Sequence, residues 1–199
     1  MNDQPLPDVR ELSSMIFPDS QFWNYSTQIY QLAQVESSCL HLQNSFEADV
    51  NILLYCCWLA EQGIELDTQD IQRLIAASQP WQTSMIKPLR EARNMMKQHI
   101  IALPSEMLEQ TIANISEMEL NAEHMAQLSL EKAINTKTRQ KNSEKNPVEI
   151  AAHNLALYSK ALESIAANSN IMTDLGVLLD AIFQDNEATQ SALMLVAVS

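Results

Sequence analysis

The sequence predicts an all-α protein, an irregular helical bundle of about six to eight helices with a long antiparallel helical hairpin. Only two glycines, Gly63 and Gly176, occur in 199 residues, and tight hairpins and phosphate-binding loops depend on glycine. The helix formers Ala, Leu, Gln, Glu and Met are abundant instead. Hydrophobic residues make up 46% of the chain, which argues against disorder and for a buried core.

The first half of the chain carries the signals of a compact helical bundle, expected over residues 19–101. Three prolines within residues 1–18 favour a flexible leader before it. Capping residues and apolar spacing then predict helices after Ser20, over 34–43, over 47–62, after Asp67, and over 80–100. Proline is tolerated in the first turn of a helix, as expected for Pro80, whereas Pro88 should kink the last of these helices.

The helix expected over 47–62 should stand at the centre of the bundle. Residues 52–60 are apolar without interruption, and a helix that is apolar on nearly every side is normally buried. An Asn44–Glu47 capping box is expected to open it, and Gly63 to end it in a left-handed conformation. Cys56 and Cys57 are expected to be small buried hydrophobes, because no zinc-ligand spacing follows them.

The second half predicts a long helical hairpin over 104–168, with a basic polar linker at 135–146. Its first arm, 105–134, has an apolar stripe spaced by threes and fours: Leu108, Ile112, Ile115, Met118, Ala122, Met125 and Leu128. Its second arm begins at Asn146 and Pro147 and has a heptad seam: Val148, Ala151, Leu155, Tyr158, Leu162 and Ile165. The two arms can fold back on each other, or the seam can form a homodimer. A C-terminal helix and tail are expected over 169–199.

A polar cluster is expected near the start of the 47–62 helix. Asp49 and Asn51 fall in its first two turns, and a carboxylate close to a buried helix needs partners or loses its charge. Arg90 and Arg93, three residues apart, can point to one side of their helix and serve as those partners. A structural network is favoured, while a ligand-binding or catalytic cluster remains the alternative. In the second case Trp23, Tyr30 and Trp58 are expected to line the cavity.

No motif for catalysis, a metal ion or a cofactor is present. The chain has no glycine-rich phosphate loop and no G-x-S-x-G, H-E-x-x-H or C-x-x-C. Glu149 and His153 are four residues apart, but di-iron bundles repeat Glu-x-x-His at a spacing of three. Glu119 and Glu123 are interpreted as a solvated acidic face. No catalytic residue, metal ligand or cofactor is therefore assigned.

The net charge of −13 disfavours binding to nucleic acid and to anionic membranes. The candidate basic patch, Lys137, Arg139, Lys141 and Lys145, is interpreted as a solvated linker beside an acidic helix. The N-terminus lacks the pattern of a secretory signal, and the longest apolar run falls far short of the roughly 20 residues that span a bilayer. Three cysteines form no disulfide framework. A cytoplasmic location is expected.

Several stretches resemble one protein family. They are "FW" at 22–23, Tyr30, Val35, "CLHLQ" at 39–43, "DVNILL" at 49–54, Trp58, Trp81, "KPLREAR" at 87–93, "ELNAE" at 119–123 and "NLALY" at 154–158. Together they resemble a proteobacterial family of short conserved all-helical proteins of unknown function. The resemblance implies a bacterial, cytoplasmic, helical protein and no particular activity. The family typically has a glycine just before the Asp-Val-Asn element, where this chain has Phe46-Glu47-Ala48.

Two functions are consistent with these observations. The leading interpretation is a non-enzymatic helical protein that acts through protein–protein interaction with an unidentified partner. It is favoured by the missing catalytic motifs, the heptad seam and the one-sided acidity of residues 105–134. The alternative is a small-molecule-binding protein or enzyme that uses the Asp49, Asn51, Arg90 and Arg93 cluster in a bundle cavity.

Overall fold

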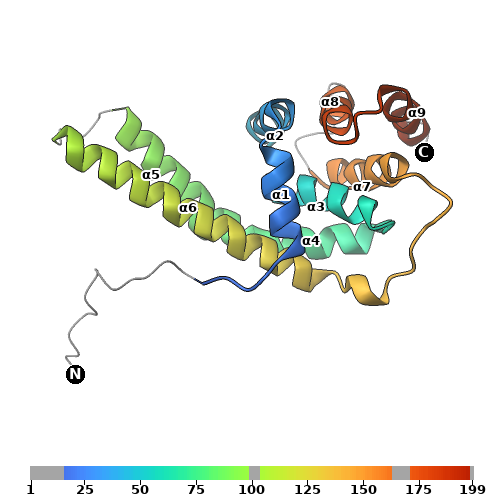
Figure 1. Cartoon of the computed structure of the whole chain (residues 1–199), viewed down its shortest axis with the longest axis horizontal. Helices are drawn as coiled ribbons and strands as arrows, with labels where there is room; N and C mark the ends of the chain where they lie inside the picture. Colours follow the sequence, from blue (N-terminus) through green and yellow to red (C-terminus); the bar gives the residue numbers. More distant parts are fainter. Residues whose placement is uncertain (1–15, 99–103, 163–170, 198–199) are drawn as a thin grey trace.

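The computed structural model describes residues 16–98, 104–162 and 171–197 (Figure 1). All regular elements in these ranges are helical, so the predicted all-α class is confirmed. Most of the expected leader lies outside the described residues. Within the described ranges, the helices fall short of the length and apolar character that a bilayer crossing requires.

The molecule consists of a body and a projecting arm (Figure 1). The helices of the body are α1 (Gln21–Tyr30), α2 (Ala33–Phe46), α3 (Val50–Glu61), α4 (Thr68–Trp81), α7 (Pro147–Ala161), α8 (Ile171–Phe183) and α9 (Asn186–Ala197). The arm contains the π-helical turn η2 (Gln82–Ile86), α5 (Lys87–Lys97) and the first part of α6 (Ser105–Ala133). A short 3₁₀ turn, η3 (Thr136–Thr138), follows α6.

Helix α3 is the centre of the body. Its residues from Asn51 to Ala60 are all buried, and it packs against α7, α1, α2 and α6. Cys56 and Cys57 are fully buried free thiols, as the sequence predicts. Gly63 follows the helix with φ +73°, which confirms the expected left-handed end. The apolar run therefore forms a pillar that the surrounding helices cover.

The start of α3 differs from the prediction. Helix α2 continues to Phe46, and α3 begins only at Val50. Between them, Glu47 has φ +55° and ends α2 in the left-handed conformation. The predicted capping box at Asn44 and Glu47 is therefore wrong, and Asp49 is itself the N-cap of α3.

A long helical hairpin is present, but α5 and α6 form it, instead of the two arms that the sequence predicts over 104–168. Helix α6 packs against α4 and α5, whereas α7 packs against α3, α9, α8 and α4. The expected pairing of 105–134 with the heptad seam is therefore wrong. Helix α7 is buried on several sides because it is rich in alanine and other small side chains, among them Ala151, Ala152 and Ala156, which let neighbours approach closely. The expected domain boundaries stay a prediction, and Ile165 lies outside the described residues.

Helices α4 and α5 belong to one continuous rod. Pro80 lies inside α4, near its end, so the expected new helix at residue 80 is instead a continuation. The residues that flank η2, Trp81 and Lys87, keep right-handed helical angles. The kink predicted at Pro88 stays a prediction; the π-helical turn that precedes Pro88 is one of the usual causes of helix bending. The rod leaves the body at η2 and continues as the arm.

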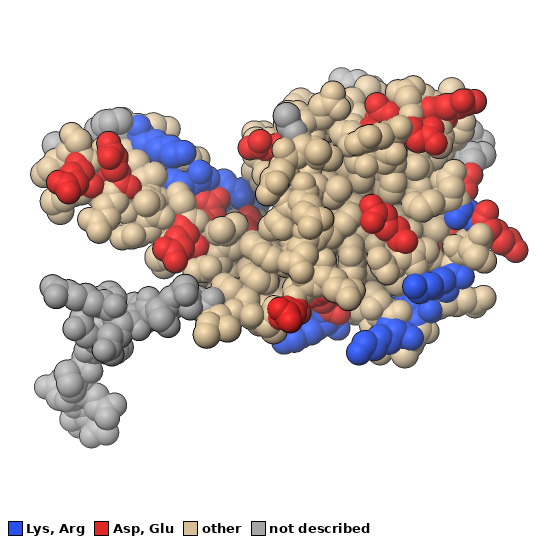
Figure 2. Space-filling model, in the orientation of Figure 1, with Lys and Arg blue, Asp and Glu red and all other residues tan. Residues whose placement is uncertain are grey.

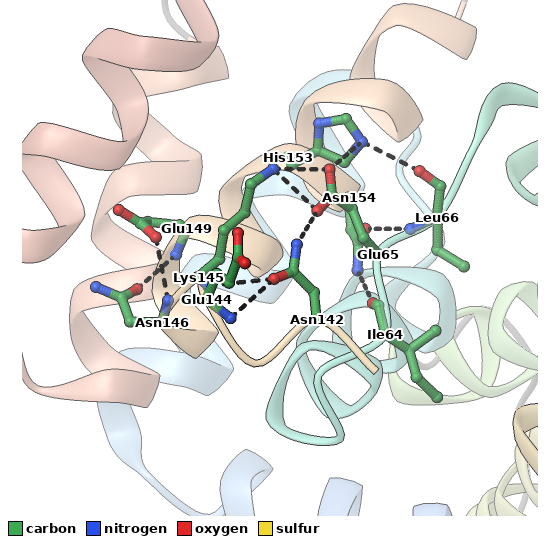
Figure 3. A network of polar contacts seen from close by, with 10 residues as sticks. All are labelled: Ile64, Glu65, Leu66, Asn142, Glu144, Lys145, Asn146, Glu149, His153 and Asn154. Atoms are coloured by element: carbon green, nitrogen blue, oxygen red, sulfur yellow. Dashed lines mark hydrogen bonds and ion pairs between the residues drawn. The ribbon is translucent and has the colours of Figure 1, made fainter. Parts of the chain in front are cut away.

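The linker at 135–146 is attached to the body by polar contacts (Figure 3). The Lys145 ammonium lies 2.9 Å from both Glu65 carboxylate oxygens, and the Asn142 backbone N–H donates to the Gly63 carbonyl at 2.7 Å. Asn154, fully buried on α7, accepts from the Leu66 N–H and donates to the carbonyl oxygens of residues 56 and 64. These contacts thus hold the linker against the residues that connect α3 and α4.

Candidate ligand-binding cleft

A cleft of about 650 Å³ lies at the base of the arm. Helices α1, α2, α3, α5 and α6 contribute its walls. Its polar and charged lining includes Ser26, Thr27, Gln31, Glu36, Gln43, Asn44, Asn51, Arg90, Arg93, Asn94, Glu119, Glu123 and Gln127, and its apolar and aromatic lining is Trp23, Tyr30, Leu40, Val50, Leu54 and Leu120. A second hollow of about 490 Å³ lies among α2, α8 and α9, where Asp180 is the ionisable lining residue.

Two arginines of α5 and two glutamates of α6 form the charged floor of the cleft. Arg90 donates from Nε to Glu119 Oε1 at 3.0 Å and from Nη2 to Glu123 Oε1 at 3.2 Å. Arg93 donates from Nη2 to Glu119 Oε1 at 3.2 Å, and its Nε lies 2.8 Å from Glu119 Oε2. Glu119 therefore holds both guanidiniums, and its side chain is only 11% exposed.

Uncharged polar side chains extend this network to α3 and α1. The Asn51 amide donates to Glu123 Oε2. Gln127 donates from Nε2 to Asn51 Oδ1 at 2.9 Å, and Ser26 Oγ donates to Gln127 Oε1 at 3.0 Å. Asn51, Gln127 and Ser26 are all buried. A continuous chain of hydrogen bonds thus connects α1, α6, α3 and α5 through the cleft.

The environment of Glu123 changes its acidity. Burial and the charge of Asp49 raise the Glu123 pKa to about 7, while the Asn51 amide and the Arg90 guanidinium act in the opposite direction. A carboxyl group with a pKa near 7 exists in both protonation states under ordinary conditions. Such groups are common at functional sites, where they bind charged ligands or transfer protons.

Asp49 lies behind the cleft and has a structural role at the start of α3. Its Oδ1 accepts from the Asn51 backbone N–H at 2.9 Å, and its Oδ2 accepts from the Ser78 hydroxyl. Its own backbone N–H donates to the Tyr158 hydroxyl oxygen at 2.8 Å. The arginines expected as its partners bind α6 instead. Burial raises the Asp49 pKa, partly offset by these hydrogen bonds.

The two predicted tryptophans lie in different surroundings. Trp23 lines the cleft, and its ring stacks on His124 with centroids 4.0 Å apart and planes at 5°. Phe17 also stacks on His124, at 4.1 Å. Trp58 instead packs in the core beside Phe22. Of the aromatic residues expected to line a cavity, Trp23 and Tyr30 do so and Trp58 does not.

The residues that sequence reasoning missed are those of α6. Glu119 and Glu123 face α5 and α3, so the prediction of a solvated acidic face is wrong for both. Together with Gln127 they are spaced by four, which places them on one helix face. Arg90 and Arg93, three apart, offered the complementary charge on α5. The complementary spacing of acidic residues on α6 and basic residues on α5 was the signal that could have predicted these ion pairs.

The possible metal-ligand pair on α7 serves the structure in other ways. Glu149 completes a capping box with Asn146 at the start of α7. A ring nitrogen of His153 lies 3.1 Å from the Leu66 carbonyl oxygen. Across the described ranges, His, Cys, Asp and Glu side chains nowhere gather in threes with a geometry that could hold a metal ion.

A family model described as "Protein of unknown function (DUF2390)" matches residues 21–130. The matched interval runs from α1 to near the end of α6, and it contains all residues that line the cleft. No curated protein and no solved structure matches the chain significantly.

Proposed function

The chain belongs to the family described as Protein of unknown function (DUF2390), and we propose that it binds a small molecule in the cleft at the base of the arm. One observation carries the proposal: a hollow of about 650 Å³ is lined by converging polar side chains and by aromatic walls. Ligand sites usually combine a hollow of this size with a few well-placed polar groups.

A polar network that served only the structure would be expected to be sealed from solvent, with no open cleft beside it. Burying charges costs free energy that ion pairing does not always recover, and apolar residues could join α5 to α6 with less desolvation. Here Arg90 and Arg93 are each 24% exposed and Glu123 is 22% exposed, so these groups are held in place yet reachable from the hollow. Fixed polar groups beside open space are suited to orienting a ligand.

The proposal is tested by filling the cleft. Asn94 lies on α5, is exposed, and lines the hollow. Asn114 is an equally exposed asparagine on α6 outside the lining. A library of charged and neutral metabolites is screened for compounds that raise the melting temperature of the wild type and of the Asn94→Trp and Asn114→Trp variants.

We expect some compounds to stabilise the wild type and Asn114→Trp equally, and to lose most of that effect with Asn94→Trp. Binding to the folded state raises the melting temperature by mass action, so blocking the cleft removes the shift. Equal shifts in both variants, or no stabilising compound at all, would refute the proposal.

We also infer a second candidate function, protein–protein interaction through the arm. Large apolar side chains are exposed there, including Met107 at 55% and Met118 at 53%. Methionine-rich surfaces often bind partner proteins because the side chain adapts to many shapes. The acidic residues nearby on α6, among them Glu106 and Glu109, favour a partner segment that is apolar and basic. Lys and Arg side chains line one edge of the arm (Figure 2), which restricts such a partner to the α6 side.

The test compares affinity capture by three forms of the chain. A Met107→Ser and Met118→Ser double variant should lose a stoichiometric basic partner that the wild type captures. Met194→Ser, at a site 68% exposed on α9, should keep it. Equal capture by all three would place the interaction elsewhere.

A further inference from the structure

Two aromatic side chains form one wall of the cleft. Trp23 and Tyr30 are seven residues apart on α1, so they project from the same face of the helix, and both line the hollow. Stacking on His124 fixes the indole ring of Trp23. The faces of aromatic rings attract ammonium and guanidinium groups electrostatically, most strongly in the case of tryptophan.

Carboxylates around the cleft outnumber its basic side chains. The charged lining residues are Glu36, Glu119, Glu123, Arg90 and Arg93. Asp49 adds a further carboxyl group behind the lining, close enough for its charge to act on Glu123. With Asp49 included, four carboxyl groups surround two guanidiniums, and the ionised carboxylates would stabilise an added positive charge there.

The two arginines already have carboxylate partners on α6, which disfavours an anionic ligand. Glu119 accepts from Arg90 and Arg93 through the same oxygen, Oε1, and its other oxygen lies 2.8 Å from Arg93 Nε. An anion would either displace this carboxylate or bind the remaining guanidinium N–H groups beside Glu119 and Glu123. Both arrangements cost electrostatic free energy.

Glu123 is the group to which a bound cation would add both charge compensation and hydrogen-bond donors. Its oxygens receive one hydrogen bond from the Asn51 amide and one from Arg90, and each carboxylate oxygen can accept a second one. Burial and Asp49 raise its pKa to about 7, so Arg90, at 3.2 Å, compensates its ionised form only in part. A ligand ammonium beside it would supply both the charge and the missing donors.

We infer that the ligand of the cleft is an organic cation with an aromatic or other flat apolar part. The inference rests on the proposed small-molecule function. The cationic group would lie beside Glu123, and the flat part would lie against Trp23 and Tyr30. Glu36, at the start of α2, would attract the cation to the entrance.

The test uses three probes of one shape and different charge: benzylamine, benzyl alcohol and benzoate. Binding is measured at pH 8 by titration, following the NMR signal of the Trp23 indole N–H. Fragments of this size bind weakly. We expect benzylamine, as its ammonium form, to bind at least about tenfold more tightly than the other two probes, the factor expected from one good charge contact.

Variants separate the cleft from the general negative charge of the chain. Glu123→Gln should lower benzylamine affinity about tenfold, whereas Glu117→Gln removes an exposed charge from the same helix and should leave the affinity unchanged. Glu36→Gln, at an exposed site, provides a second cleft variant with little risk to folding and should weaken binding a few fold. Wild-type affinity should rise by roughly five- to tenfold from pH 6 to pH 8 as Glu123 ionises.

The outcomes distinguish this inference from the function on which it rests. Tighter binding of benzoate, equal binding of all three probes, or no binding at all would overturn the organic cation. Equal losses in Glu123→Gln and Glu117→Gln would also overturn it. The small-molecule function itself stands or falls with the separate comparison of Asn94→Trp and Asn114→Trp.

Discussion

The α3 helix and the α5–α6 arm are held in place by opposite kinds of interaction. All residues of α3 from Asn51 to Ala60 are buried, and most are apolar. Helix α5, by contrast, contains no fully buried residue and is joined to α6 by arginine–glutamate pairs. Burying a large apolar side chain contributes about 1.5–3 kcal/mol, whereas partly exposed ion pairs contribute much less.

This contrast indicates which region supplies the stability of the chain and which region moves more easily. The body should determine the global free energy of unfolding, and the arm should open first. The cleft lies at their boundary, with one wall from the stable α3 and another from the less stable α5. A ligand that contacts both walls would therefore stabilise the arm against opening. The experiments below test whether the stability of the arm is independent of that of the body.

The largest effect is expected in α3. Leu59 is fully buried, whereas Leu120 on α6 is 55% exposed. Leu59→Ala should lower the free energy of unfolding by about 2–5 kcal/mol, because it removes buried methylene groups and leaves a cavity. Leu120→Ala should change it by less than about 0.5 kcal/mol. Chemical denaturation measures both, and similar losses would contradict the division into a stable body and a less stable arm.

Next in size is the loss of the ion pairs that hold the arm. Glu119→Gln removes the charge that Arg90 and Arg93 share, and should destabilise the arm by about 2–3 kcal/mol because two partly buried guanidiniums lose their partner. Hydrogen exchange of amides in 87–97 should become at least tenfold faster, while α3 amides change little. Glu117→Gln, at an exposed site on α6, is the matched control. Unchanged exchange in α5 would show that the pairs do not hold the arm.

The N-cap of α3 should show a smaller effect. Asp49→Ala removes the acceptor for the Asn51 N–H and for Ser78, and should cost about 1–2 kcal/mol. Asp49→Asn should stay within about 0.5 kcal/mol of the wild type at pH 7, because asparagine caps helices equally well and burial already disfavours the Asp49 charge. Equal losses in the two variants, measured by denaturation, would mean that the charge itself is required.

The pH dependence of stability should reflect Glu123. Its pKa is about 7 in the folded chain, against 4.5 for the free side chain, so between these values the folded state binds more protons than the unfolded one. Its contribution is fully present below pH 4.5 and is lost as the pH rises through 7. The wild type should therefore lose about 2–2.5 kcal/mol relative to Glu123→Gln between pH 5 and pH 8. Parallel curves would place the raised pKa elsewhere.

The smallest effect should be a gain at the α2–α3 junction. Glu47 has φ +55°, a conformation that glycine adopts without the strain of a side chain. Glu47→Gly should therefore raise the free energy of unfolding by about 0.5–1 kcal/mol. The 3.7 Å pair with Lys87 is exposed and contributes little. Ser45→Gly, inside the last turn of α2, should be destabilising instead, and a loss in both variants would contradict the assignment of strain to Glu47.

Local signals predicted much of the body. The uninterrupted apolar run identified α3 as central, Gly63 gave its end, and Asn146 with Pro147 gave the start of α7. These features depend on residues near one another in the chain, where spacing and capping chemistry are direct evidence. The prediction of a capping box at Asn44 is wrong because α2 continues past this residue to Phe46. The helix α3 starts only at Val50, where Asp49 is the N-cap.

The cleft could be predicted only in part. The sequence predicts one cluster that contains Asn51, Arg90, Arg93 and Trp23. It does not predict their partners on α6, because Glu119 and Glu123 are expected to face the solvent. The apolar stripe that includes Met118 predicts the buried side of α6, whereas Met118 is 53% exposed. Which face of an amphipathic helix is buried depends on the neighbour, and here the neighbour is α5 with its arginines. Long-range pairing of that kind leaves no signal in one segment alone.

The π-helical turn at Gln82–Ile86 determines the angular phase of everything that follows it. A π turn accommodates one residue more than an α turn, and one residue corresponds to about 100° around a helix. Deleting one residue such as Thr83 together with the π turn would leave the phase of α5 nearly unchanged. If instead all five residues adopted the regular α-helical pitch, α5 would rotate by about that angle. Arg90 and Arg93 would then point away from Glu119, although no residue of the floor had been altered. The direction in which the arginines of the cleft point therefore depends on the wider pitch of a single turn that precedes α5.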